Sequence, residues 1–294
     1  MKPAPYFRRA RGFTLVEAIV AIVIVGILGA IVAVFIRAPM QSYADTVARA
    51  EASDEADLAL RRMAREIRLA LPNSVRVSAG GDSIEFLLTR TGGRYLAAED
   101  AVLDRPVLDF VNPANTTFMV VGGLQTDVET SDYVVVYNLG PGLAPSDAYA
   151  FNSANRNIAR VRTRAFAGGT RLELMDNPFA RAEPMPSPGR RFQVVSTPVT
   201  YSCENGSGGL VLTRRANYDI RAEITDPMTG NATSAVLARR LASCANLFSY
   251  GAADVELRRS ALVLLSLSLH TRGAGDAGNG SVRLVHQVHV DNTP

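Results

Sequence analysis

An uninterrupted apolar run near the N-terminus constrains this chain more than any other feature. Residues 13–36 read FTLVEAIVAIVIVGILGAIVAVFI, and Glu17 is the only charged residue among them. A helix of this length spans about 36 Å, more than the hydrocarbon core of a bilayer. Four basic residues precede the run: Lys2, Arg8, Arg9 and Arg11. The positive-inside rule therefore predicts a cytoplasmic N-terminus and an outward-facing remainder.

Two simpler interpretations explain less of the run. A secretory signal peptide has an apolar stretch of about 7–15 residues and then a small-residue cleavage site. This run is longer, and Arg37-Ala38-Pro39 follows it. A plain signal anchor accounts for the length but not for Glu17, because a charge inside an apolar span is costly. Glu17 is therefore a candidate functional residue.

The residues around this glutamate carry a family resemblance. Residues 11–17, RGFTLVE, resemble the leader junction of type IV pilins and type II secretion pseudopilins. The resemblance implies a prepilin peptidase that cuts between Gly12 and Phe13, and N-methylation of Phe13. It also implies that Glu17 is an assembly residue. The implied partners are that peptidase, other major and minor pilins, an inner-membrane assembly platform and inner-membrane lipid.

Elementary electrostatics is consistent with that role for Glu17. A carboxylate about 4 Å from a neighbour's N-terminal amine is attracted by about 4 kcal/mol at an effective dielectric near 20. Gly26 and Ala30 form a small-xxx-small pair, which fits either close helix contact or a lipid-facing surface. The chain also departs from the family pattern, because Val34 stands where many major pilins have proline. Pro39 follows five residues later, where it can kink the helix.

The helix is expected to continue well beyond the apolar run. Residues 41–71 contain no glycine or proline and end at Leu71-Pro72. Leu60, Met63, Ile67 and Leu71 form one apolar stripe, which we expect to pack on a sheet of the same chain. The expected organisation is a cleaved leader at 1–12, a helix at 13–71 with its transmembrane part at about 13–36, and an extracytoplasmic head at 72–294.

The head is expected to be rich in β-strands, which makes the fold class α+β, with one long helix against a mostly antiparallel sheet. The expected strands are Ser83–Leu88, Asp132–Asn138, Arg171–Leu174, Arg191–Cys203, Gly209–Arg215, Ser260–His270 and Ser281–Val290. Residues 204–209 read as a turn between two of them, and residues 140–157 as loop. Ser234–Cys244 is expected to form a short helix.

A narrower resemblance rests on three segments at the two ends of the chain. Residues 57–65, 71–76 and 286–292 resemble minor pilins of mannose-sensitive haemagglutinin-type (MSHA-type) pili, whereas residues 90–190 resemble nothing recognisable. The resemblance implies a structural role in filament assembly, initiation or at the tip. The alternatives are a J-like minor pseudopilin of type II secretion, or an enzyme or adhesin with a membrane anchor.

Charge and cysteine content bear on the compartment and on partners. Without the four basic residues of the leader, 27 basic residues face 28 acidic ones, so no nucleic-acid partner is expected. The chain has two cysteines, Cys203 and Cys244. They would be thiols in a reducing compartment, but we expect a disulfide because the implied location is a single-pass inner-membrane protein with a periplasmic head, later part of a filament.

No arrangement of residues in the sequence predicts catalysis, so the protein is not expected to be an enzyme or to need a cofactor. The three histidines are His270, His286 and His289. His286 and His289 have a spacing that suits a metal on a helix, but on a strand residues three apart point to opposite faces. No metal site is therefore expected. The motifs GxSxG, GxxxxGK[ST] and HExxH do not occur.

Overall fold

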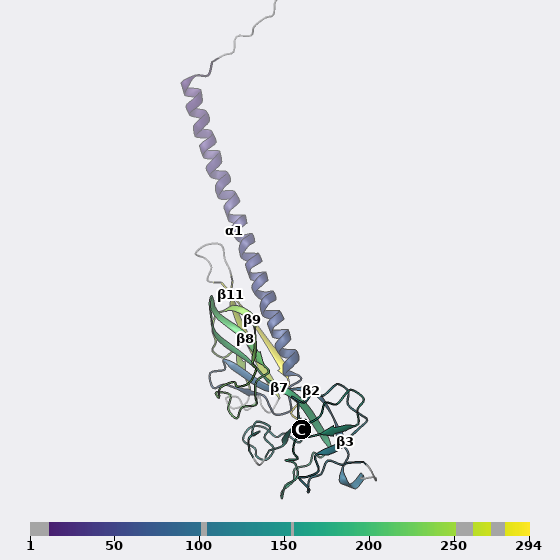
Figure 1. Cartoon of the computed structure of the whole chain (residues 1–294). Helices are drawn as coiled ribbons and strands as arrows, with labels where there is room; N and C mark the ends of the chain where they lie inside the picture. The colour runs from purple at the N-terminus through teal and green to yellow at the C-terminus, as the bar shows by residue number, and fades with distance from the viewer. Residues whose placement is uncertain (1–11, 101–104, 154–155, 251–260, 272–279) are drawn as a thin grey trace, which may run out of the picture. The chain divides into compact units, whose positions relative to one another are not determined.

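The computed structural model describes residues 12–100, 105–153, 156–250, 261–271 and 280–294. Its elements are α1 (Leu15–Ile67), β1 (Arg76–Val77), β2 (Ser83–Tyr95), η1 (Ala98–Asp100), β3 (Thr117–Val121), β4 (Tyr133–Val135), β5 (Ile158–Arg160), β6 (Arg171–Glu173), β7 (Arg191–Gly206), β8 (Gly209–Ala216), β9 (Thr233–Leu241), β10 (Phe248–Ser249), β11 (Leu262–His270) and β12 (Ser281–His289). One long helix and a large antiparallel sheet confirm the expected α+β class (Figure 1).

The chain divides into two compact units, of which the smaller is Met1–Ala50 with Thr271–Gly280. Its described part consists of the first two thirds of α1 and the residue pair Thr271 and Gly280, joined by a backbone hydrogen bond of 2.8 Å. The helix runs through Pro39 without ending. Proline has no N–H, so the carbonyl of Phe35 lacks its usual helical donor there.

The larger unit, Glu51–His270 with Ser281–Pro294, contains the sheet and the last turns of α1. Its strand order among the described residues is β12-β11-β9-β8-β7-β2-β3-β6, and the short β10 pairs with β11 on the edge opposite β12. The helix buries Leu60, Met63 and Ile67 against this sheet, in one cluster with Phe86 and Tyr201. The predicted packing of the apolar stripe is therefore confirmed. Its fourth member, Leu71, is buried in a neighbouring cluster instead.

The helix ends at Ile67, four residues before the expected Leu71. Ala70 already forms a bridge with Leu88, and the N–H of Leu71 donates to the carbonyl of Leu87 at 2.8 Å. The chain thus leaves the helix to pair with β2 before Pro72 is reached. Sheet pairing, rather than the proline, sets the boundary.

The expected strands are present, with different bounds, and one assignment was wrong. Residues 233–241 form strand β9, not the short helix expected at Ser234–Cys244. The segment is rich in Ala, Leu and Arg, which favour helices, but pairing with β8 from Leu210 to Ala216 overrides that preference. The hairpin between β7 and β8 pairs Gly206 with Gly209, which confirms the expected turn.

The middle of the chain folds into a small closed barrel that the sequence did not predict. Strands β4, β7, β2, β3 and β6 pair in that order, and β5 pairs with β4. Two hydrogen bonds of 2.8 Å, Arg162 N to Glu173 O and Met175 N to Arg160 O, then join β6 to the end of β5 and close the ring. Alternate residues point inward and form one buried cluster: Phe118 and Val120, Val134 and Val136, Ala159 and Val161, Leu172 and Leu174, Phe192 and Val194.

Two long strands connect the barrel to the sheet that packs on α1. β2 and β7 pair along most of their length, and their register shifts between Leu87 and Thr91. Such bulges bend a strand and increase its twist, which lets one pair of strands serve both layers. Pro198 lies in β7 between the stretch that pairs with β4 and the stretch that pairs with β8, so the missing N–H breaks no ladder on that edge.

Candidate functional site

The residues expected to be cut lie in an exposed, non-helical segment directly before α1. Gly12 and Phe13 are both exposed, and Phe13 keeps 73% of its surface accessible. A Cβ added at Gly12 would meet nothing within 4 Å. The fold of this chain therefore does not require glycine at position 12. A requirement for glycine would have to come from another molecule, such as a protease that approaches the backbone closely.

Thr14 caps the start of the helix and fixes the local position of Glu17. The N–H of Glu17 donates to Thr14 Oγ1 at 3.3 Å, and the N–H of Ala18 donates to the Thr14 carbonyl at 3.1 Å. Thr14 is thus the N-cap and Glu17 the third helical residue, the spacing of a capping box. The T-x-x-E pattern is visible in the sequence, so this role of Thr14 could have been predicted. A carboxylate at this end of a helix is also favoured by the helix dipole.

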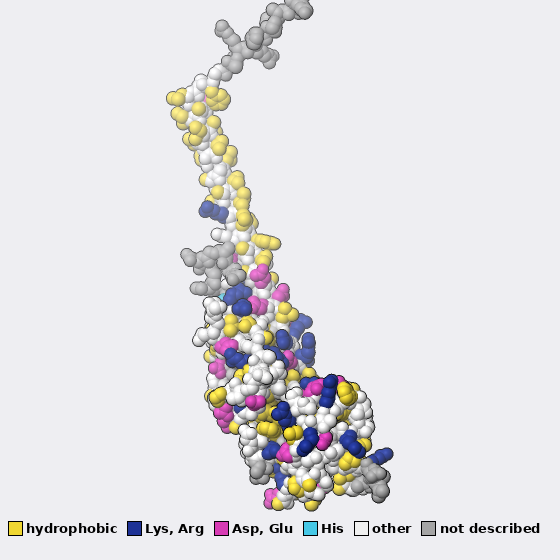
Figure 2. Space-filling view, viewed as in Figure 1, with side chains coloured by type: hydrophobic (Ala, Val, Ile, Leu, Met, Phe, Trp, Pro, Cys, Tyr) yellow, Lys and Arg dark blue, Asp and Glu magenta, His cyan; other side chains and the backbone are white. Residues whose placement is uncertain are grey.

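Glu17 has no ion-pair partner within the described part of the chain. Its side chain is exposed, and so are the large apolar residues on both sides of it in the sequence, from Leu15 at 80% to Ile36 at 52%. Figure 2 shows this part of α1 covered with apolar side chains. The carboxylate therefore stands at the edge of an apolar surface, where it can pair only with groups outside this chain's described residues.

Among the described residues, α1 is the one helix that is long and apolar enough to cross a membrane. Its best 18-residue window has a mean hydropathy of 3.3, and none of that window is buried within the chain. A core helix of a soluble protein would bury such a window. Exposed apolar area on this scale instead needs lipid or neighbouring helices as its cover. These features fit membrane anchoring.

Comparison with known families points to the same segment. Residues 7–33 match the family model of the prokaryotic N-terminal methylation motif. This match supports a type IV pilin or pseudopilin. The motif implies processing by a prepilin peptidase and assembly with other pilins, and its family is structural rather than catalytic. No curated protein and no solved structure matches the chain.

The two cysteines belong to the larger unit. Cys203 in β7 and Cys244, which follows β9, form a disulfide with a Cα–Cα distance of 5.4 Å. The bond ties the tip of the β7–β8 hairpin to the segment between β9 and β10. The structure thus contains the expected disulfide and leaves no free thiol.

Residues 71–76 and 286–292 meet in space. Asn73, just after α1, donates from Nδ2 to the carbonyl of Asn292 at 3.1 Å and to that of Asn138 at 3.0 Å. Its backbone N–H lies 3.4 Å from Asn292 Oδ1. Asn73 has a φ of 60°, a left-handed conformation that asparagine tolerates better than most residues. These segments therefore clamp the C-terminus to the end of the helix.

A buried carboxylate in β2 was not predicted and is structural. Glu85 is fully buried, and it accepts hydrogen bonds from Arg76, Thr200, Tyr218 and Arg221. The last two residues belong to the loop between β8 and β9, which this carboxylate fixes to β2. Burial and the nearby carboxylate raise the pKa of the Tyr218 hydroxyl. No sequence signal joins these partners, because they are scattered along the chain.

The histidines do not assemble into a metal site. His286 and His289 both lie on strand β12, and their different burial agrees with side chains on opposite faces. His270 is the last residue of β11 and is exposed. The described residues contain no group of three or more His, Cys, Asp or Glu side chains that could hold a metal ion.

Proposed function

We propose that this chain is a minor pilin of a type IV pilus, of the MSHA type and similar to MshO. In this proposal residues 1–12 are a leader that a prepilin peptidase removes, and Phe13 is then N-methylated. α1 anchors the protein in the inner membrane as a single pass, with residues 72–294 as a periplasmic head. The protein then enters a filament, and its contribution is structural.

The observation that carries the proposal is the combination of an exposed Gly12–Phe13 junction with Glu17 at the start of an exposed apolar helix. None of these three residues is needed for the described fold, because each is exposed. A larger side chain would fit at position 12 without a clash. Glu17 has no ion pair in the described part of the chain. A peptidase that cuts between Gly12 and Phe13, and a neighbouring subunit that pairs with Glu17, would need these residues even though the fold does not.

The minor, initiating or tip-proximal role rests on the size of the head and on the resemblance of residues 286–292. A head with both a sheet on α1 and an additional barrel is bulky for a repeating filament subunit. The disulfide supports an oxidising compartment such as the periplasm. A type II secretion pseudopilin shares the same N-terminal features, and a membrane-anchored adhesin needs neither Gly12 nor Glu17.

Processing is tested by intact-mass measurement and by a matched pair of glycine variants. The wild-type protein from membranes should begin at Phe13 and carry one extra methyl group. Gly12→Leu should leave the longer precursor in the membrane. Gly29→Leu is the control, because a Cβ at Gly29 also meets nothing within 4 Å. A wild-type protein that starts at Met1 would refute the proposed cleavage.

Assembly is tested by charge variants of Glu17 and by mass spectrometry of sheared filaments. Glu17→Gln and Glu17→Lys should be processed and stay in the membrane but be depleted from filaments, with the lysine variant worse because it repels a neighbour's amine. Glu183→Lys makes the same charge change on the exposed surface of the head and should assemble normally. Normal recovery of Glu17→Lys in filaments would contradict the role. Absence of the wild-type protein from sheared pili would favour the type II secretion alternative.

A further inference from the structure

The free edge of strand β12 is a row of backbone groups that no other described strand pairs with. β12 pairs with β11 along its whole length in a single register. Hydrogen bonds of 2.8 Å extend this register beyond both ends, from Val290 N–H to the Ala261 carbonyl and from Thr271 N–H to the Gly280 carbonyl. Because backbone groups alternate in direction along an antiparallel ladder, the even-numbered residues of β12 face β11. The N–H and C=O groups of its odd-numbered residues therefore point away from the sheet.

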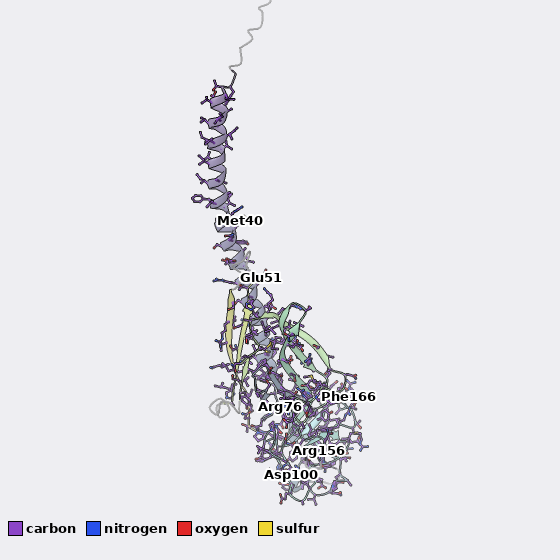
Figure 3. All side chains as sticks on the ribbon, turned by 90° about the vertical axis from the view of Figure 1, so that its left-hand side faces the viewer. Met40, Glu51, Arg76, Asp100, Arg156 and Phe166 are labelled. Carbon is purple, nitrogen blue, oxygen red and sulfur yellow. A yellow bond between two sulfur atoms is a disulfide. The ribbon has the colours of Figure 1, made fainter. Side chains whose placement is uncertain are left out.

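β12 lacks most of the features that protect an edge strand from pairing. Its nine residues, SVRLVHQVH, include no proline and no lysine, and its register with β11 has no bulge. Arg283, Val285 and Gln287 are exposed, and Val285 keeps 55% of its surface accessible. Figure 3 shows the hairpin of β11 and β12, in yellow, at one margin of the larger unit. An edge of this length and regularity is a template for a further strand.

The two faces of β12 indicate what such a strand would carry. On the inner face, Val282 and Leu284 are half-buried and pack against the hydrophobic cluster beneath α1. An added strand would place its own inward residues beside them, so apolar residues are favoured there. On the outer face, Arg283 donates from Nε to Ser266 Oγ at 3.0 Å and makes no ion pair with any described residue. Strands β11 and β12 contain no acidic residue, so Arg283 favours an acid opposite it on the added strand.

A second copy of the chain fits this edge less well than an acidic segment does. Two β12 strands can pair antiparallel about Val285, which places Arg283 of one copy opposite Gln287 of the other. That arrangement satisfies the backbone groups but leaves both arginines without a carboxylate. Charge complementarity therefore favours a segment from a different polypeptide.

We propose that the free edge of β12 binds an extended segment of another protein as an added strand. Alternate residues of that segment are apolar, and one of the others is an acid that lies opposite Arg283. Main-chain hydrogen bonds hold such a strand, and the side chains on its two faces select it. The inference goes beyond the proposed function, because the edge belongs to the head and depends on neither the leader nor Glu17. It gives the head a binding surface separate from α1.

Amide hydrogen exchange of the full-length protein in detergent micelles tests the edge. The probe is a synthetic peptide, TVTVEVTVT, and the control is the same peptide with lysine in place of glutamate. In the free protein the amides of Arg283, Val285 and Gln287 should exchange faster than those of Leu284 and His286, which donate to β11. At about nine times its Kd, the acidic peptide should slow exchange of the three outward amides about tenfold. The two inward amides should not change.

Substitutions at two positions separate strand addition from general apolar binding. Val285→Pro removes an outward N–H but none that donates to β11, so the hairpin should remain folded. It should weaken binding of the acidic peptide by about two- to twelvefold, the range for one lost hydrogen bond. Val285→Thr keeps the N–H and is the matched control, which should bind normally. Arg283→Glu should reverse the preference between the two peptides, by up to about fivefold for each exposed charge pair.

Photo-cross-linking from position 287 in cells tests which molecule occupies the edge. The expected adduct joins Gln287→benzoylphenylalanine to an extended, acid-bearing segment of a different polypeptide, and Val285→Pro should abolish it. An adduct with a second copy of the chain would overturn the inference. Equal binding of the two peptides, or no protection of the outward amides at millimolar peptide, would overturn it as well.

These outcomes are distinguishable from failure of the proposed function. An edge that binds no strand, in a protein that is processed and found in filaments, would contradict this inference alone. Selective binding of the acidic peptide by a protein that is never processed would support the edge and contradict the proposed function.

Discussion

Replacing Glu85 should reduce the stability of the head more than any other single charge change, because two buried guanidinium groups depend on it. Its carboxylate accepts six hydrogen bonds. The two arginines are nearly inaccessible, with side-chain exposures of 11% for Arg76 and 8% for Arg221, against 0% for Glu85. Each also donates to a backbone carbonyl of the β8–β9 loop, so the carboxylate and the loop position each other.

The magnitude follows from what remains after the carboxylate is removed. Breaking a buried ion pair by deleting one partner costs about 3–5 kcal/mol, because the other charge stays buried without compensation. Glu85→Ala leaves both guanidiniums without this acceptor, so we expect at least that loss, whereas the hydroxyls of Thr200 and Tyr218 lie 2.6 Å apart and can still pair with each other. This is a large part of a typical domain stability of about 5–15 kcal/mol. Glu85→Gln keeps the shape and one acceptor oxygen and should cost less than Glu85→Ala.

The measurement is urea unfolding of the full-length protein in detergent micelles. The chain has no tryptophan, and seven of its nine tyrosines belong to the head, so near-ultraviolet circular dichroism of the tyrosines reports the packing of the head. Glu204→Gln is the matched control, since the Glu204–Arg215 pair has side-chain exposures of 31% and 33% and is expected to contribute about 0–1 kcal/mol. Replacing Arg76, Glu85 and Arg221 together with apolar residues should cost less than Glu85→Ala. If Glu85→Ala is no more destabilising than the Glu204 control, the reasoning is wrong.

Three further predictions concern the head. Replacing both Cys203 and Cys244 with alanine should destabilise it by up to about 4 kcal/mol, the chain-entropy value for a loop of this length, as read by the urea midpoint. Gly93→Val should cost about 1–3 kcal/mol, because an added Cβ comes within 3.0 Å of an aromatic ring inside the barrel, whereas Gly208→Ala, which has open space, should change little. Burial raises the pKa of the Asp132 carboxyl, so the folded state binds its proton more readily than the unfolded state does. Lowering the pH from 7 toward 4 should therefore stabilise the wild type relative to Asp132→Asn, and an unchanged difference between their urea midpoints would contradict the shift.

The sequence predicted those parts of the fold whose signals are local. The apolar stripe through Leu60, Met63 and Ile67 has a helical period, and the structure buries it. The strands before and after the β7–β8 turn are bounded by glycines and were placed correctly apart from their ends. At the candidate site, the T-x-x-E pattern of Thr14 and Glu17 was also local, and it could have given the helix start.

The parts that were missed depend on contacts between residues distant in the sequence. The barrel closes where Arg160 and Arg162 meet Glu173 and Met175, and three of its strands have only three residues, too few to show a period. Strand β9 has the composition of a helix, and it is a strand because its backbone pairs with that of β8. The partners of Glu85 come from three separate places in the chain, at residues 76, 200 and 218–221, so no short window of sequence contains the site.

Two isoleucines of the same helix show how folding and assembly are divided along it. Ile67 is completely buried against the sheet, whereas Ile24 keeps 51% of its surface exposed. Burying an isoleucine side chain stabilises a fold by about 1.5–3 kcal/mol, so Ile67 contributes to the head and Ile24 contributes nothing of that kind within the chain. The same applies to the neighbours of Ile24, which are exposed on all sides of α1. A run of apolar residues that does not contribute to its own fold can lower its free energy only in lipid or against other helices. Substitutions in this run should therefore affect insertion and assembly while the stability of the head stays the same.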